Sequence, residues 1–84
     1  MSLNKEDLKN KIIYRASYRG TKEMDILMLS FVNSIIDDLN FDELTNLNKF
    51  VNLDDEYIKD LKNNLIVNND IKTKIIKSFI KFKL

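Results

Sequence analysis

The residue types best suited to recognising another molecule are gathered in one short stretch of this chain. Arg15 and Arg19 are the two arginines among 14 basic residues, and Gly20 is the single glycine. A guanidinium group presents a planar fork of five donors that suits carboxylates, and glycine adopts positive φ without strain. Glu23 and Asp25 follow within six residues of Arg19. The stretch is therefore a candidate binding site.

Two interpretations of this stretch remain open on spacing alone. In the structural one, Glu23 is an acid at a helix start, where the helix dipole favours a carboxylate, and it pairs with an arginine. In the functional one, an exposed turn presents the Arg19 guanidinium, the bare backbone of Gly20 and the Glu23 carboxylate as a docking patch for another protein. The docking interpretation predicts that Arg19 is exposed and that Arg19→Lys leaves the fold almost unchanged.

Catalysis by this chain itself is disfavoured by its composition. The 84 residues include no His, Cys or Trp, which removes the commonest general base and the strongest side-chain nucleophile. A metal site is also disfavoured, because the acids at 54–56 and 60 lack the calcium-loop pattern and acids are ordinary at helix starts. We expect a binding protein with no catalytic residues and no metal.

The apolar residues recur at helical spacing throughout, and no segment alternates as a strand would. We expect an all-α fold, a small compact bundle of four to five short helices, forming one domain over 1–84 and monomeric when free. Asn4, Thr21 and the Asn40/Glu43 capping box are the expected N-caps, and Gly20 is placed to end the first helix. The expected helices are 4–18, 22–39, 41–52, a short fourth helix and 70–83. The helix 22–39 is expected at the centre of the bundle. The short fourth helix is expected to be capped by Asp54 or Asp55 and to end at Asn63 and Asn64.

Charge changes sign along the chain although the net charge is only +1. Residues 1–22 carry six basic and two acidic side chains. Residues 23–60 carry two basic and ten acidic side chains, and residues 61–84 carry six basic side chains and one acidic one. This layout describes either a dipolar binding surface or solvated faces that attract one another within the bundle. A nucleic-acid-binding or regulatory adaptor is the alternative function; it rests on Lys72, Lys74, Lys77, Lys81 and Lys83. The small net charge and the interleaved apolar residues disfavour nucleic acid as a partner.

No stretch approaches the roughly 18 consecutive apolar residues of a membrane span, and the N-terminus has no apolar run typical of a signal peptide. We therefore expect a cytoplasmic protein without direct membrane insertion, and separately we expect its source to be a bacterium.

The segment 15–27, followed by Phe31, resembles the signature of the SdhE family of flavinylation factors, which is Arg-Gly-x-x-Glu, an apolar residue and Asp. The matching residues are Arg19, Gly20, Glu23, Met24 and Asp25, with Arg15 and Ala16 also in the family's places. A second match is the apolar run from Phe50 that ends in Asp54 and Asp55. The chain departs from the family at Tyr18, where a second Arg is usual, at Leu61, where a Trp is usual, and in lacking a Gly after the fourth helix.

The resemblance implies an assembly factor that is not an enzyme. Such a factor binds the flavoprotein subunit of succinate dehydrogenase, or of fumarate reductase, transiently and promotes covalent attachment of FAD to a histidine of that client. FAD is then carried by the client and is not held stably by this chain. The partner-binding residues that the resemblance implies are Arg19, Gly20, Glu23, Arg15, Asp25, Asp54 and Asp55.

Overall fold

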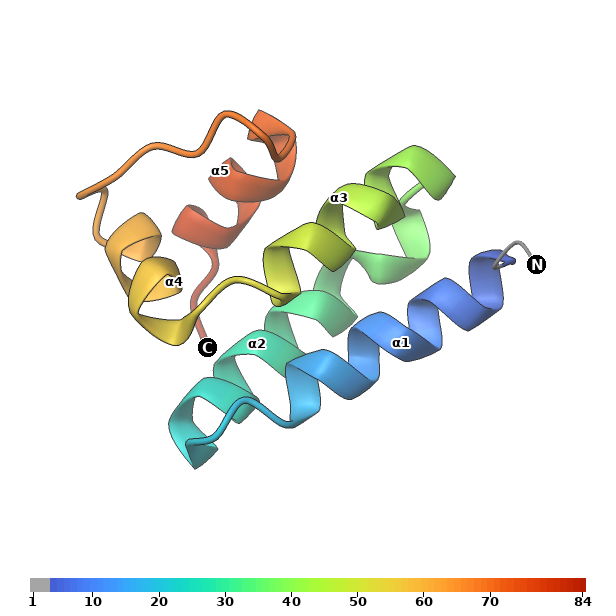
Figure 1. Cartoon of the computed structure of the whole chain (residues 1–84), viewed down its shortest axis with the longest axis horizontal. Helices are drawn as coiled ribbons and strands as arrows, with labels where there is room; N and C mark the ends of the chain where they lie inside the picture. The colour runs from blue at the N-terminus through green and yellow to red at the C-terminus, as the bar shows by residue number, and fades with distance from the viewer. Residues whose placement is uncertain (1–3) are drawn as a thin grey trace.

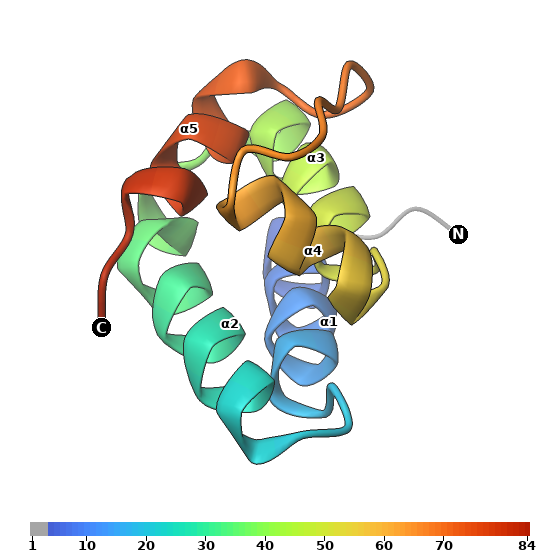
Figure 2. The ribbon, with the colours of Figure 1, turned by 90° about the vertical axis from the view of Figure 1, so that its left-hand side faces the viewer.

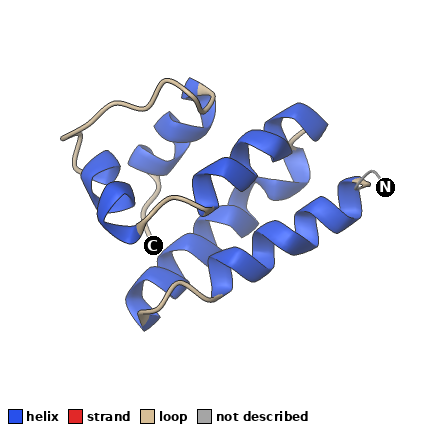
Figure 3. Cartoon of the chain, in the orientation of Figure 1, coloured by secondary structure: helices blue, strands red, loops and turns tan. Residues whose placement is uncertain are grey.

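Helix follows helix along the part of the chain that the computed structural model describes, residues 4–84. The elements are α1 (Lys5–Ser17), α2 (Lys22–Ile35), a 3₁₀ turn η1 (Ile36–Asp38), α3 (Phe41–Val51), α4 (Asp55–Lys62) and α5 (Thr73–Lys81). Figure 3 shows helices and loops without any strand over these residues. The expected all-α bundle is confirmed.

Local capping sets where three of the helices begin. The Asn4 side chain accepts a hydrogen bond from the Asp7 amide at 2.8 Å, and Thr21 Oγ1 accepts one from the Met24 amide at 3.3 Å. Asn40 and Glu43 form the reciprocal capping box. Each bond satisfies an amide that the first turn of a helix leaves without a partner, and all three N-caps are confirmed.

Two predicted boundaries are wrong by several residues. The second helix does not reach 39, since α2 ends at Ile35 and tightens into η1, as helix C-termini often do. The last helix starts at Thr73 instead of about 70. The Asn68 side chain accepts hydrogen bonds from the amides of Asp70 and Ile71, both at 2.9 Å, and this local turn competes with helix.

One aromatic cluster joins the helices at the centre of the core. Phe31 of α2 lies 5.7 Å from Phe50 of α3, 5.1 Å from Phe79 of α5 and 5.6 Å from Phe82, measured between ring centroids. Figures 1 and 2 place α1 beside both α2 and α3, with α4 and α5 packed on the side of α2 and α3 that faces away from α1. The edge-to-face geometry of these rings is the arrangement that aromatic pairs favour.

Lys62 ties the end of α4 to the end of α5. Its ammonium donates to the carbonyl oxygens of Phe79 at 2.5 Å and Ile80 at 3.3 Å, and also to that of Phe82. These carbonyls lie at the C-terminal turn of α5, where a cation complements the helix dipole. Burial lowers the pKa of Lys62, and the ammonium also lies 4.7 Å from the centre of the Phe79 ring.

The opposite charges of the chain meet as ion pairs between helices. Lys9 pairs with Asp37 at 3.1 Å, Lys72 with Asp42 at 2.8 Å and Lys74 with Glu43 at 2.7 Å. The basic N- and C-terminal segments thus contact the acidic middle. This favours the second interpretation of the charge pattern, in which solvated faces attract one another.

Asn46 is a buried polar residue that the sequence reasoning did not single out. Its side-chain amide donates to the Asp42 carbonyl, and its oxygen accepts from the Lys72 amide, both at 3.0 Å. The side chain therefore fixes the start of α5 against α3, and all of its buried polar atoms have partners.

We expect Glu43→Gln to lower the melting temperature at neutral pH and to have no effect in strong acid. The backbone amide of Asn40, followed by Lys74, lowers the pKa of Glu43 below its ordinary 4.5. A carboxylate with a lowered folded-state pKa stabilises the fold above its unfolded-state pKa, and this contribution is lost as the pH falls through the folded-state value. Glutamine keeps the capping geometry without the charge. Thermal unfolding followed by circular dichroism at neutral and acidic pH measures this, and a difference that persists in acid would contradict it.

Candidate functional site

The turn between α1 and α2 carries most of the residues that the sequence singled out. Helix α1 ends at Ser17, and Tyr18 has already left the helical region with φ −128° and ψ 68°. Gly20 has φ +118°, and a Cβ built on it would meet no atom within 4 Å. Glycine is therefore required here by backbone conformation and not by crowding.

Gly20→Ala is expected to destabilise the fold by about 1–3 kcal/mol, because a side chain at this φ strains the backbone. Urea denaturation of the variant measures the loss. Lys22→Ala, an exposed position two residues further on, is the control and should change stability by about 0.5 kcal/mol or less. Equal stability of the two variants would show that the turn relaxes without cost.

The Arg19 guanidinium is buried, and the prediction that it is exposed is wrong. Only 1% of its side chain is accessible. Its Nε and Nη2 donate to Asp55 Oδ1 at 2.9 and 2.8 Å, and Nη1 and Nη2 also donate to the carbonyl oxygens of Val51 and Leu53. The planar fork thus donates to carbonyl oxygens at and just beyond the C-terminal end of α3 and to an acid in the first turn of α4. Carbonyls at the end of a helix lack helical partners.

The structure therefore joins two motifs that the sequence showed separately. Arg19 belongs to the first and Asp55 to the second, 36 residues apart. The predicted pairing of Glu23 with an arginine is not found, because Arg19 is bound to Asp55 and Arg15 Nη1 donates to the Tyr18 carbonyl at 3.2 Å. Guanidinium and carboxylate act here as a clamp between the α1–α2 turn and the α3–α4 junction.

Asp25 holds the same α1–α2 turn through the backbone of Arg19. Its Oδ1 accepts a hydrogen bond from the backbone amide of Arg19 at 2.5 Å. The carboxylate therefore fixes the chain next to Gly20, where the backbone takes its unusual conformation. Asp25 and Asp55 are both half-buried, in contrast to Asp54, which is exposed and makes no side-chain capping bond at the start of α4.

Gly20 and Glu23 remain exposed on the outside of the clamped turn. Two exposed tyrosines precede them in the chain: Tyr14 and Tyr18 are 69% and 67% exposed, with ring centroids 4.8 Å apart. In the sequence Tyr18 stands out only as a departure from a family pattern, although two tyrosines four residues apart at the end of a helix are themselves a signal of a binding surface. Exposed tyrosines are typical of protein-binding surfaces.

A hollow of about 390 Å³ opens next to Glu23. Met24 and Leu27 of α2 supply apolar surface there, and Glu23 and Lys59 supply one charge of each sign. The arrangement suits an apolar side chain of a partner flanked by polar groups. It offers no nucleophile paired with a base, and no cluster of acids within 4–84 could hold a metal ion.

The lysines in and next to α5, which supported the nucleic-acid alternative, are not all free of ion pairs. Lys72 and Lys74 are engaged by acids of α3. Within the described chain no helix is long and apolar enough to cross a membrane.

In a comparison with protein families, residues 10–82 match the family described as flavinator of succinate dehydrogenase. The matched range includes the α1–α2 turn, the α3–α4 junction and all of α5. No curated protein and no solved structure matches the chain significantly.

Proposed function

The chain belongs to the flavinator of succinate dehydrogenase family, and from this we propose that it binds the flavoprotein subunit of that enzyme and promotes covalent attachment of FAD to it. The family match over 10–82 carries the proposal. The exposed Gly20 and Glu23 on a rigid turn, with a hollow beside them, support it as a binding surface. We propose that this activity takes place in the cytoplasm and that the complex with the flavoprotein subunit is transient.

The chain's contribution is to bind and orient, since it has neither the histidine nor the cysteine to which flavins are commonly attached. The client supplies both FAD and the histidine that becomes attached to it. A partner that binds only the conformation in which these two meet raises the population of that conformation. In this proposal FAD stays with the client throughout.

The burial pattern divides the candidate residues into two groups. Gly20, Glu23 and the exposed Asp54 are available to touch the client. Arg19, Asp25 and Asp55 act as positioning residues, because their polar groups already bond one another or the backbone across the turn. Arg15 holds the Tyr18 carbonyl and stays partly accessible.

Glu23→Gln is expected to leave the fold intact and to lower covalent FAD on the client about tenfold, as loss of a central interface charge does. The flavoprotein subunit is co-expressed with each variant in cells that lack the endogenous factor, and flavin fluorescence is read on a denaturing gel. Glu56→Gln is the matched control, because Glu56 is also an exposed acid in the first turn of a helix but lies on α4.

Normal flavinylation with Glu23→Gln would remove Glu23 from the interface. Failure of the wild-type chain to support flavinylation, or to co-purify with any flavoprotein, would overturn the proposed function as a whole. Nucleic acid recovered with the chain in place of a flavoprotein would favour the alternative.

A further inference from the structure

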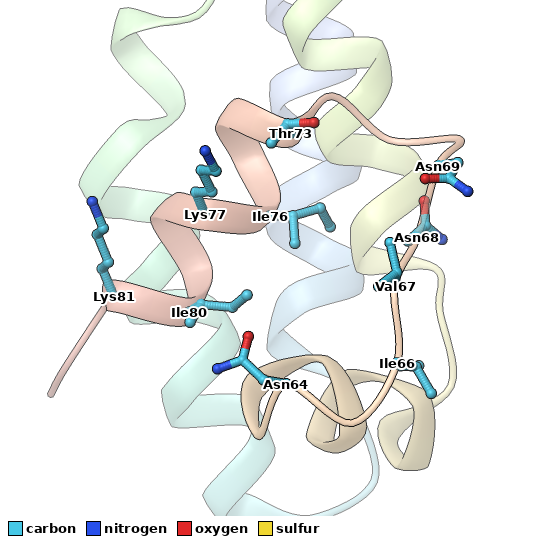
Figure 4. Close-up of a pocket in the computed structure, with 10 residues that line it drawn as sticks. All are labelled: Asn64, Ile66, Val67, Asn68, Asn69, Thr73, Ile76, Lys77, Ile80 and Lys81. Carbon is cyan, nitrogen blue, oxygen red and sulfur yellow. The ribbon is translucent and has the colours of Figure 1, made fainter.

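A second hollow lies on the opposite side of the molecule from the α1–α2 turn. It has a volume of about 480 Å³ and is formed between the loop 63–72 and α5. Figure 4 shows Val67, Ile76 and Ile80 turned toward this space. Its walls are therefore largely aliphatic.

The loop that forms one wall presents apolar side chains to water. Leu65 and Val67 are 70% and 81% exposed, although their neighbour Asn68 bonds the Tyr57 hydroxyl at 3.0 Å and the amides that follow it. The loop is thus fixed in a conformation that leaves aliphatic groups uncovered. Such a patch beside a hollow is a mark of an interaction surface.

The charges at the rim have one sign. Lys77 and Lys81 line the hollow one helical turn apart along α5, and their ammonium ends extend away from the loop 63–72 (Figure 4). No acidic residue lines it, and neither lysine has an ion pair within residues 4–84, whereas Lys72 and Lys74 of the same region do. The rim is complementary to a ligand that carries carboxylates.

Polar groups at the rim favour a peptide over a lipid. The side chains of Asn64 and Asn69 line the hollow and bond no other group in the described part of the chain. An amide offers both a donor and an acceptor, which matches the backbone of a peptide and has no counterpart in an acyl chain.

We propose that this hollow docks an acidic, aliphatic segment of a partner protein. An aliphatic side chain of the segment fills the space between Val67 and Ile80, and carboxylates beside it pair with Lys77 and Lys81. Figures 1 and 2 place the loop 63–72 at the top of the molecule and the α1–α2 turn at the bottom. The two surfaces can be occupied together, and this proposal does not depend on the proposed function.

The test is selection from a library of random dodecapeptides displayed on phage, with the full chain as bait. We expect the enriched peptides to combine Asp or Glu with Leu, Ile or Val. Their binding should weaken about tenfold or more with the double variant Lys77→Glu/Lys81→Glu, through like-charge repulsion. Val67→Asp should act in the same direction, and since all three positions are exposed, these variants should fold normally.

The matched control is Lys5→Glu/Lys11→Glu, which reverses two exposed lysines of α1 and should leave peptide binding unchanged. Enriched peptides without acids, or peptides that bind the α5 double variant as tightly as the wild type, would overturn the proposal. The proposal would also be overturned if no such peptide is enriched and the chain instead binds vesicles containing phosphatidylglycerol through Lys77 and Lys81. The surface would then bind lipid.

Discussion

Arg19→Lys is expected to remove about 2–4 kcal/mol of folding free energy, a large part of the total stability of a domain of this size. The guanidinium serves Asp55 and two backbone carbonyls at once. An ammonium group has no planar fork and cannot reach all three, so buried acceptors lose their partners. Asp55→Asn should cost a comparable amount, toward the lower end because the Asp55 side chain is 29% exposed. Urea denaturation followed by circular dichroism measures both.

Arg15→Lys is the matched control for this prediction. Arg15 is partly exposed and makes one hydrogen bond, to the Tyr18 carbonyl, so its exchange should cost about 0.5 kcal/mol or less. The double variant Arg19→Lys/Asp55→Asn should be clearly less destabilised than the sum of the single variants, because the two residues share one interaction. Equal stability of the Arg15 and Arg19 variants, or strict additivity, would refute the clamp.

Phe31→Ala is expected to leave the chain largely unfolded at 37 °C. Phe31 is 1% exposed and touches aromatic rings from two other helices and from the segment after α5. Loss of a buried phenyl group costs about 3–5 kcal/mol, which approaches the lower limit of stability for whole domains. Circular dichroism at 222 nm against temperature reports the loss of helix.

The control is Phe31→Leu, which keeps most of the volume and should retain a cooperative transition at a lower temperature. A cooperative melt of Phe31→Ala close to that of the wild type would mean that the neighbouring rings close the cavity and that Phe31 is not central to the core.

The helices were predictable because their signals are local. Asn4, Thr21 and the pair Asn40/Glu43 act on amides three residues away, so spacing alone located the starts of α1, α2 and α3. The start of α5 was not predictable in the same way. It depends on Asn68, which bonds the amides that follow it, and on Asn46, which bonds the Lys72 amide from 26 residues away.

Arg19, Asp25 and Asp55 of the candidate site do lie together, but the burial of Arg19 could not be predicted. The rarity of Arg and Gly in a lysine-rich chain pointed to residues 15–20. It did not show whether a guanidinium meets a client or its own chain, because Val51, Leu53 and Asp55 lie more than thirty residues beyond Arg19. Burial of a long polar side chain depends on tertiary packing and cannot be obtained from helix periodicity.

The clamp at Arg19 also bears on the order of folding. Its hydrogen bonds close chain segments of 32 to 36 residues, and such long loops are entropically costly to close before the intervening helices have formed. Helices α2 and α3, which lie between Arg19 and its acceptors, must be in place before the guanidinium can reach them. The turn that carries Gly20 and Glu23 thus gains its final shape late in folding, and a client that recognises that shape selects completed chains over folding intermediates.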